Sequence, residues 1–373
     1  MPRTLDSKFH IDNIVDQFGA DLDADKVKAY CSNHEVGYQT ITKYLNQFKT
    51  KRGHWKVTVK EAKRQLEKTL ENSNVGIAKT TIQAENLVPA KDDTFIKFGA
   101  FPDLKKVIAS RLFYPVFITG MSGNGKTFGV EQACNQTNRE LIRVNITVET
   151  DEDDLIGGFR LVNGETVWHN GPVIEALERG AILLLDEVDL ASNKILCLQS
   201  ILEGKGVFLK KIGEYIKPSA GFNIVATANT KGKGSDDGRF IGTNVLNEAF
   251  LERFPITIEQ DYPSVVTETK ILTKVSESLN IPMIGEHKAF ITHLCNWADI
   301  VRRTFNDGGV DEIISTRRLT HIIRAYSIFG NKMKAVEMCL NRFDDETKES
   351  FTQLYSKLDE TVNVTESTQS VDS

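Results

Sequence analysis

Length, composition and charge exclude several classes of protein. The chain has 373 residues, of which 40% are hydrophobic and 26% charged, and this is ordinary for a folded chain of two or three domains. A formal net charge of −5 argues against a protein that coats nucleic acid through its overall charge, although it leaves room for local basic patches. No apolar run approaches about eighteen residues, and residues 1–13 lack an apolar signal core, so we expect neither a membrane span nor secretion. The five cysteines are widely spaced, as in cytoplasmic proteins whose thiols stay reduced.

The first part of the chain is polar and patterned as helices. We therefore predict a small, mainly helical N-terminal domain over residues 1–70. Apolar residues at helical spacing in Asp23–Val57 indicate two short helices with a turn near Asn33–Gly37, similar to a helix-turn-helix. Residues 71–94 show only weak periodicity, and we predict that they form a linker.

Basic residues gather in the second half of this N-terminal domain. The stretch over residues 36–60 contains no acidic residue and six basic ones, which are Lys43, Lys49, Lys51, Arg52, Lys56 and Lys60. With Tyr38 and Trp55 interleaved, such a stretch can contact the phosphates of a nucleic acid. A protein-docking module with a solvated lysine face is the more ordinary interpretation, and the pattern leaves both open.

Short apolar runs alternate with helical patterns over residues 95–262. The runs cover residues 115–120, 141–148, 181–188, 222–229 and 254–260. Strands that are separated by helices pair in parallel through crossover connections. We therefore predict an α/β domain with a parallel sheet.

Two hairpins are predicted to interrupt this domain. Asn163-Gly164 lies between two apolar-rich runs in Phe159–Trp168, and Asn-Gly is the strongest short signal for a hairpin turn. Gly206–Pro218 also reads as two short strands. Because a minimal nucleotide-binding sheet needs neither hairpin, both are interpreted as insertions.

The chain changes character again after the predicted sheet. A helical period dominates residues 263–358, which predicts a small all-helical domain. Residues 359–373 contain few large apolar residues, and we expect a disordered tail there.

A glycine-rich loop identifies a candidate nucleotide site. Residues 120–127, GMSGNGKT, fit the pattern G-x-x-x-x-G-K-[ST] without a mismatch, between an apolar strand and a helical pattern. The glycines let successive N–H groups turn toward phosphate oxygens at a helix N-terminus. In this interpretation Lys126 bridges the β- and γ-phosphates, and the Thr127 hydroxyl ligates Mg²⁺. The predicted nucleotide-binding residues of the loop are Gly120, Met121, Ser122, Gly123, Asn124, Gly125, Lys126 and Thr127.

The apolar run ILLLDEVD supplies a second element of the site. Asp186 lies at the carboxyl end of this strand, where open α/β sheets bind ligands. Its carboxylate can contribute to nucleotide binding by holding Mg²⁺, and we predict Thr127 and Asp186 as the metal residues. Glu187 is predicted to orient or deprotonate the attacking water.

Three further polar residues are candidates for catalysis. Asn229 ends another buried strand and can hydrogen-bond the γ-phosphate or the water beside Glu187. Arg253 ends a helical pattern over residues 244–253; with that helix on the flank of the sheet, it reaches a neighbouring subunit's γ-phosphate better than its own. Arg317 and Arg318 open a helix of the C-terminal domain, where one of them can fold back onto the phosphates, and we prefer Arg317.

These motifs, in this order, resemble the AAA+ ATPases. Within them the chain is similar to the MoxR-like, dynein-related branch and to the ATPase subunit of aerobic cobaltochelatase. The resemblance rests on ATANTKGKGSDDGRFIGTNVLNEAFLERF (226–254), on DLIGGFRLVNGETVWHNGPVIEALERGAILLLDEVDLA (154–191) and on the pairing of VRRTF with STRRL. It covers residues 95–345, with a Ser-Thr-Arg where Ser-Pro-Arg is common in that family. A phage-borne version, acting in the cytoplasm of the host, also fits the resemblance.

The resemblance implies a fold and an activity. The fold is a P-loop AAA+ parallel sheet with hairpin insertions, followed by a small helical lid. The activity is Mg²⁺-dependent ATP hydrolysis at the interfaces of a ring, taken as a hexamer, whose hairpins act on a protein partner. It also implies that Asn229 is the sensor-1 residue, Arg253 the arginine finger and Arg317 the sensor-2 residue.

The leading hypothesis is therefore a ring motor that remodels or activates a protein partner, of the chelatase or MoxR-like kind. The alternative is a nucleic-acid-binding AAA+ machine that grips DNA or RNA through residues 36–60. A GTPase motor of the restriction type is a less favoured variant, because its strand-end sequence differs. An inactive ring is the least favoured, because no catalytic position is replaced.

Overall fold

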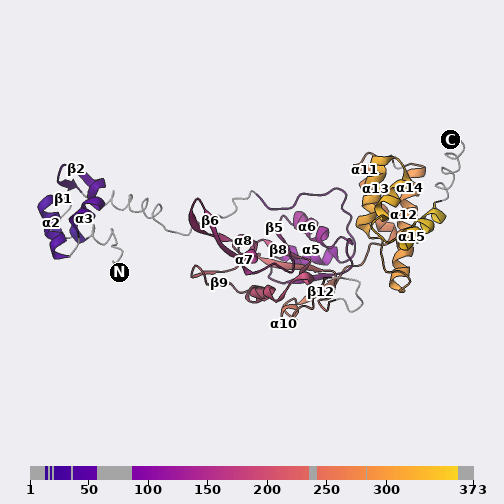
Figure 1. Cartoon of the computed structure of the whole chain (residues 1–373), viewed down its shortest axis with the longest axis horizontal. Helices are drawn as coiled ribbons and strands as arrows, with labels where there is room; N and C mark the ends of the chain where they lie inside the picture. The colour runs from indigo at the N-terminus through magenta and orange to yellow at the C-terminus, as the bar shows by residue number, and fades with distance from the viewer. Residues whose placement is uncertain are drawn as a thin grey trace. The chain divides into compact units, whose positions relative to one another are not determined.

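The chain divides into two compact units, Met1–Ala78 and Lys79–Ser373, shown in Figure 1. The computed structural model describes residues 13–15, 17–18, 21–34, 37–56, 86–234, 242–282 and 284–359. None of the helices in these ranges combines the length and the hydropathy that a bilayer crossing requires.

A five-stranded sheet forms the centre of the second unit. All of its strands are parallel, in the order β12-β4-β11-β8-β5. Strands β4, β8 and β11 are buried along their whole length, as expected of apolar runs that are covered on both faces. The strands are β4 (Val116–Thr119), β5 (Leu141–Asn145), β8 (Ile182–Asp186), β11 (Asn223–Ala228) and β12 (Ile256–Glu259). The predicted parallel α/β sheet is confirmed.

One strand is shorter than the sequence indicates. The apolar run over residues 141–148 predicts a longer strand, but β5 ends at Asn145. Thr147 and Thr150 close a turn instead, in which Thr147 N donates to Thr150 Oγ1 at 2.9 Å and Thr150 N donates to Thr147 O at 3.2 Å. The threonine side chain thus satisfies backbone groups that a strand would have paired.

Helices cover the sheet and connect its strands. Apolar side chains of α5 and α6 pack together on Val116, Ile118 and Leu184 of the sheet. The longer helices of this domain are α5 (Phe101–Ser110), α6 (Lys126–Gln136) and α8 (Pro172–Arg179). The shorter ones are α7 (Glu152–Leu155), η2 (Val188–Leu190), η3 (Asn193–Leu198), α9 (Gln199–Leu202) and α10 (Glu248–Leu251).

Both predicted hairpin insertions are present. The first pairs β6 (Gly157–Val162) with β7 (Glu165–Asn170) through Asn163 and Gly164, which have φ values of 52° and 84°. Positive φ at both central residues is the requirement that makes Asn-Gly a strong hairpin signal. The second hairpin pairs β9 (Val207–Leu209) with β10 (Glu214–Ile216). Figure 1 shows β6 and β9 at the same end of the domain.

A helical domain follows the sheet, as predicted. Its core is built from apolar faces of all five helices and includes Leu272, Trp297, Ile322, Val336 and Tyr355. The helices are α11 (Val265–Ser278), α12 (Glu286–Asn306), α13 (Thr316–Phe329), α14 (Lys332–Leu340) and α15 (Asp345–Leu358). The expected disordered tail lies outside the described residues except for Asp359, which is buried and accepts a hydrogen bond from Tyr355 Oη at 2.9 Å.

The predicted linker is shorter than residues 71–94. Residues 71–85 lie outside the described part of the chain, but residues 86–94 run against the α/β domain. Gln132 of α6 accepts a hydrogen bond from Asp92 N at 3.1 Å and donates one to Ala90 O at 3.0 Å. Asn135, one turn further along, donates to Pro89 O at 2.8 Å. The weak periodicity has a physical reason, because these residues are held through their backbone rather than through an apolar face.

The N-terminal unit contains the two predicted helices and a small sheet that was not predicted. Helices α2 (Ala24–Asn33) and α3 (Tyr38–Leu45) are followed by η1 (Asn46–Phe48). The antiparallel sheet has the order β1-β3-β2. Its strands are β1 (Asp21–Asp23), β2 (Lys49–Lys51) and β3 (His54–Lys56). Each strand has only three residues, and β2 and β3 contain lysine. The sequence therefore has no alternation of apolar residues that would predict these strands.

Trp55 also departs from the expectation for residues 36–60. Its side chain is only 5% exposed and belongs to the core of this unit with Tyr30, Ile41 and Leu45. It is therefore unable to stack on a nucleic acid. Lys60 lies outside the described residues.

Candidate active site

The loop over residues 120–125 joins β4 to α6 and requires glycine at two positions. Gly120 and Gly123 have φ values of 146° and 72°. A Cβ at Gly120 would overlap with Gln260 O, and one at Gly123 would lie 2.8 Å from Ser315 Oγ. The two glycines therefore let the loop pack directly against Gln260 and Ser315. The last N–H groups of the loop lie at the start of α6, as phosphate binding requires.

Lys126 projects from the first residue of α6 back toward this loop. Its Nζ donates to Gly120 O at 2.6 Å, to Met121 O at 3.0 Å and to Asn229 Oδ1 at 3.2 Å. Burial lowers the pKa of Lys126 to about 8, and the nearby carboxylates of Asp189 and Asp186 oppose that shift. An anion bound in the loop would raise the pKa of Lys126 again and so favour its charged form.

Asp186 links three elements at the carboxyl end of β8. It is 4% exposed, and its Oδ1 accepts hydrogen bonds from Thr127 Oγ1 at 2.8 Å and from Thr227 Oγ1. A hydroxyl and a carboxylate side by side are the oxygen donors that Mg²⁺ prefers, so the predicted metal residues fit that ion. Arg143 of β5, which the sequence analysis did not single out, pairs with the other oxygen, its Nη2 lying 2.6 Å from Asp186 Oδ2.

Glu187 directly follows β8 in a backbone conformation that is uncommon for a residue with a side chain. Its φ and ψ are 59° and 44°, and its N–H donates to Thr227 Oγ1 at 3.2 Å. The residue is exposed and lines the cavity described below. Strained backbone of this kind clusters at functional sites, where surrounding contacts maintain it.

Asn229 follows β11, and a buried carboxylate sets its position. Asp189 is fully buried, and its Oδ2 accepts the backbone N–H groups of Asn229 and Thr230, each at 2.9 Å. The Asn229 side chain is thereby placed to accept the hydrogen bond from Lys126. Sequence reasoning missed Asp189, although its place three residues after Asp186 in LLLDEVD is a usable signal.

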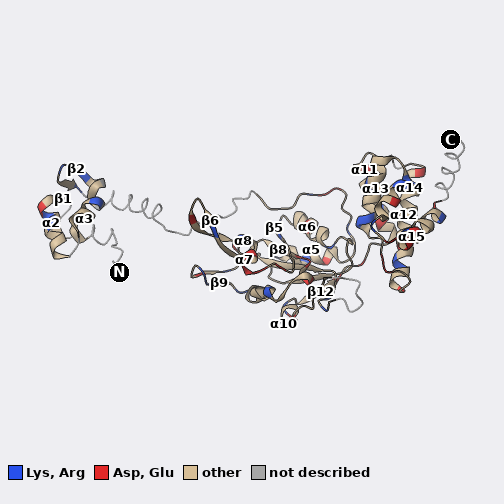
Figure 2. Ribbon diagram, viewed as in Figure 1, with Lys and Arg blue, Asp and Glu red and all other residues tan. Residues whose placement is uncertain are grey.

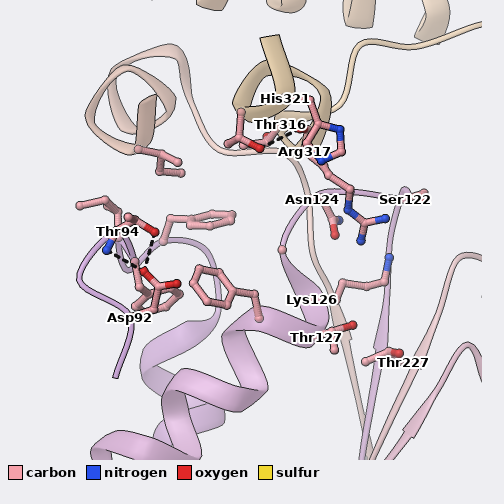
Figure 3. Close-up of a pocket in the computed structure, with 18 of the residues that line it drawn as sticks. Asp92, Thr94, Ser122, Asn124, Lys126, Thr127, Thr227, Thr316, Arg317 and His321 are labelled. Carbon is pink, nitrogen blue, oxygen red and sulfur yellow. Dashed lines mark hydrogen bonds between the residues drawn. The ribbon is translucent and has the colours of Figure 1, made fainter. Parts of the chain in front are cut away.

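These side chains surround one cavity of about 390 Å³, a volume typical of small-molecule sites. Figure 3 shows Lys126 and Thr127 on one side, Arg317 and His321 on another, and Asp92 with Thr94 on a third. The last side was not predicted, and it is largely apolar. Its lining residues include Phe95, Ile96, Phe98, Phe128, Ile271 and Val275.

Arg317 and Arg318 point in different directions from the start of α13. Arg317 lines the cavity, and its backbone N–H donates to Gly123 O at 3.1 Å. Figure 3 shows its side chain directed toward Asn124 and Lys126. Arg318 turns into the helical domain instead, where it donates to Cys339 O and its guanidinium lies 4.4 Å from the centre of the Phe343 ring.

A buried ion pair holds this part of the helical domain in place. Arg302 donates to both carboxylate oxygens of Glu268, at 3.0 Å and 2.7 Å, and Thr316 Oγ1 donates to the same carboxylate at 2.6 Å. Arg302 also lies over the ring of Tyr262, whose hydroxyl donates to Ser122 O of the loop at 2.7 Å. The similarity that pairs VRRTF with STRRL thus has a physical basis, because Glu268 joins the two segments.

Residues 115–254 match the family model described as the AAA domain of the dynein-related subfamily. This match covers β4, the loop, Asp186, Glu187, Asn229 and Arg253. The segment is a AAA domain of the dynein-related subfamily. Such a domain implies ATPase activity.

Curated relatives extend the similarity beyond the AAA domain itself. Aerobic cobaltochelatase subunit CobS of Sinorhizobium sp is 25% identical over 249 residues, covering 65% of this chain and 74% of that protein. Protein NorQ of Paracoccus denitrificans is 31% identical over 164 residues, or 43% of this chain and 58% of that protein. Midasin of Dictyostelium discoideum is 34% identical over 184 residues, or 47% of this chain and 3% of that protein.

Within the AAA domain, Arg253 is apart from the other predicted catalytic residues. It does not line the cavity. Its Nε and Nη2 donate to Glu203 Oε1 at 3.0 Å and 2.7 Å, and Nη1 donates to Ala249 O. The cavity of one chain therefore brings together Lys126, Thr127, Asp186, Glu187, Asn229 and Arg317, but not Arg253.

The helix before Arg253 is shorter than expected. A helical pattern over residues 244–253 predicts ten residues, whereas α10 spans only Glu248–Leu251 and Asn247 caps its first turn. Asn244 is held outside the helix, because its N–H donates to Asp189 O at 2.7 Å and its side chain donates to Leu190 O at 3.0 Å. These bonds connect the Arg253 segment to the same Asp189 that positions Asn229.

Proposed function

We propose that this chain hydrolyses ATP at the seams of a ring of identical subunits and uses the energy to remodel a protein partner. The observation that carries the proposal is the division of the site. Ten of the predicted residues line one cavity, and Arg253 lies outside it. The AAA domain supports the nucleotide chemistry. The position of Arg253 supports a site that two chains complete together.

The loop and its lysine are proposed to hold the phosphates. The N–H groups of residues 120–127 face the phosphate oxygens, and Lys126 exchanges its loop carbonyl partners for the β- and γ-phosphates. The apolar side of the cavity, with Phe95 and Phe98, is suited to the adenine ring. Thr127 and Asp186 would hold Mg²⁺, which when bound neutralises charge on the β- and γ-phosphates.

Glu187 and Asn229 are proposed to act on the attacking water. Glu187 is exposed to the cavity from a strained backbone position, and it accepts the proton of the water. Asn229 lies within hydrogen-bond distance of Lys126, so its amide is close to the proposed γ-phosphate position. Arg317 approaches the phosphates from the helical domain.

Arg253 is proposed to reach the γ-phosphate held by the neighbouring subunit. An arginine finger stabilises the charge of the transferring phosphoryl group and contributes a factor of about 10³–10⁵ to turnover. A head-to-tail interface that repeats around a closed ring supplies one such arginine to every site. We propose a hexamer as the closed ring.

The hairpins are proposed to contact the partner protein. Large apolar side chains are exposed on both of them, namely Leu161 on the first and Phe208 and Tyr215 on the second. Lys211 of the second hairpin pairs with Asp153, shortly before β6, so the two hairpins are neighbours. The similarity to a subunit of aerobic cobaltochelatase also supports action on a partner protein.

Mixed assemblies test the proposal. Lys126→Ala removes the phosphate contact of one chain, and Arg253→Ala removes the finger offered to the next, so each variant alone should lose at least about 10³-fold in phosphate release. In an equal mixture, about a quarter of the seams combine an intact cavity with an intact finger. Phosphate release should therefore recover to a substantial fraction of the wild-type rate.

Arg179→Ala is the matched control for Arg253→Ala. Arg179 forms a comparably exposed pair with Glu140 of its own chain, away from the cavity, and its removal should change turnover by no more than about threefold. The proposal is wrong if mixtures stay inactive while wild-type and Lys126→Ala chains demonstrably exchange subunits. It is also wrong if Arg253→Ala alone hydrolyses ATP at the wild-type rate.

A further inference from the structure

The proposed ATPase activity does not account for the order of helices and strands in the N-terminal unit. Helical positions at residues 13–15 and 17–18 precede β1, and α2, α3, β2 and β3 follow in that order. The sheet order β1-β3-β2 places β3 beside the strand that precedes α2, and β2 at the edge of the sheet. This order of elements, two helices followed by a β-hairpin, matches that of a winged helix-turn-helix, and in helix-turn-helix motifs the second helix of the pair enters the major groove of DNA.

Charge is divided between the two halves of this unit. From Gly37 to Lys56 there is no acidic residue. The basic residues of that span are Lys43, Lys49, Lys51, Arg52 and Lys56, and all five are exposed. Figure 2 shows Lys and Arg in blue on the β2 side of the unit.

The described acidic residues of the unit lie on the other half, in β1 and at the start of α2. Asp23 caps α2 by accepting the N–H groups of Asp25 and Lys26. Asp25 pairs with Lys28, and Asp21 lies opposite Lys56 in the strand register. Asp23 lies opposite His54, which in turn lies opposite Lys51, so this carboxylate is two strands away from Lys51 and on the β1 side of the wing.

Helix α3 buries one face and presents a polar one. Ile41 and Leu45 are buried in the core of the unit. Gln39, Lys43 and Asn46, on or just after the helix, are exposed. Amide groups can donate to and accept from base edges in the major groove, and an ammonium group can donate to them.

We propose that Gly37–Lys56 is a binding surface for duplex DNA, with α3 in the major groove and the β2–β3 wing along the phosphate backbone. The B-form major groove, about 12 Å wide, admits an α-helix, whereas the major groove of duplex RNA is too deep and narrow for side chains to read. Lysine and arginine on the wing match the charge of the phosphates. This surface does not depend on the proposed ATPase mechanism.

Fluorescence anisotropy of a labelled 24-base-pair DNA duplex of mixed sequence, titrated with the full chain, tests this surface. At 150 mM salt the dissociation constant should lie at about 1–100 μM, as is usual for binding without a specific site. The variant Lys43→Glu, Lys51→Glu, Arg52→Glu should bind at least about tenfold more weakly, and its salt slope should fall by about two to three. The control variant Lys26→Glu, Lys28→Glu changes charge on α2 and should bind within about threefold of the wild type.

Each remaining outcome overturns the proposal. Absence of binding at 50 mM salt would show that the surface does not recognise DNA. Equal losses in the two variants would show a diffuse attraction to the whole unit, and tighter binding of a duplex RNA of the same length would exclude insertion of α3 into a B-form groove. Basal ATP turnover of both variants should match the wild type, because the substituted side chains are remote in sequence from the cavity residues. Thermal unfolding of the first variant should also match, because Lys43, Lys51 and Arg52 are exposed.

Discussion

Two arginines of the second unit have opposite surroundings. Arg317 lies in the cavity wall, where its backbone is bonded to the glycine-rich loop and the buried Glu268–Arg302 pair supports the adjacent Thr316. Arg253 lies outside the cavity, in an exposed pair with Glu203. Arg317 is thus held at the cavity by contacts within its own chain, whereas Arg253 is held by an ion pair that lies outside the cavity. The difference separates a residue that lines the cavity of its own chain from one that lies away from it, and the proposed function gives them different roles.

After the loss already expected for Arg253→Ala, the largest effect that would sharpen this comparison is expected at Arg317. Arg317→Ala removes a charged contact to the phosphates worth about 1.5–3 kcal/mol, so turnover should fall roughly 10- to 100-fold in phosphate-release assays. Arg318→Ala is the control, because Arg318 packs on Phe343 inside the helical domain. It should lower the thermal midpoint but leave turnover within about threefold. Equal losses of turnover in the two variants would contradict the assignment of Arg317.

A moderate effect is expected from pH, because Lys126 belongs to the same wall. Its pKa is lowered to about 8, so about half of the chains carry a neutral Lys126 at pH 8 before ATP binds. The phosphates favour the charged form, and ATP binding at pH 8 should therefore take up about half a proton per site, falling to about a tenth at pH 7. Affinity should weaken as the pH rises above about 8.

Calorimetry in two buffers of different ionisation enthalpy measures this uptake. The apparent binding enthalpies should differ between the buffers at pH 8 and nearly agree at pH 7. Identical enthalpies at pH 8 would show that Lys126 is already charged in the free chain.

The smallest effect is expected at Glu203. Exposed ion pairs contribute little, so Glu203→Gln should release Arg253 and raise turnover by at most about fivefold. Lys205→Ala is the matched control, since Lys205 also pairs with Glu203 but carries no proposed role. A loss in Glu203→Gln as large as that expected for Arg253→Ala would show that the pair positions the finger rather than restraining it.

Much of the fold is predictable because its signals are local. Asn163-Gly164 announces a hairpin turn through the positive φ that both residues adopt. The apolar runs of β4, β8 and β11 are buried because each is a central strand covered on both faces. The three-residue strands of the N-terminal unit carry no such signal, since Lys49–Lys51 and His54–Lys56 are held by pairing with each other and with β1.

The candidate site also contains residues that a local sequence pattern predicts and residues that it does not. Lys126 and Thr127 belong to a motif with fixed spacing, so their proximity follows from the sequence. Arg143, Asp189 and Phe95 come to the site from β5, from the turn after β8 and from the segment before α5. Their proximity depends on the order of strands in the sheet and on how residues 86–98 lie against α6. No local sequence pattern predicts the strand order or this packing.

The amino-acid sequence by itself determined the glycine-rich loop between β4 and α6, the acidic strand end and the alternation of strands and helices, because each depends on residues within a few positions of one another. Only the tertiary structure decided that Arg317 rather than Arg318 lines the cavity, that Arg253 lies outside it, and that a basic wing follows α3. These depend on contacts between residues far apart in the chain, such as Arg318 with Phe343 and Arg253 with Glu203, which packing selects and local spacing does not.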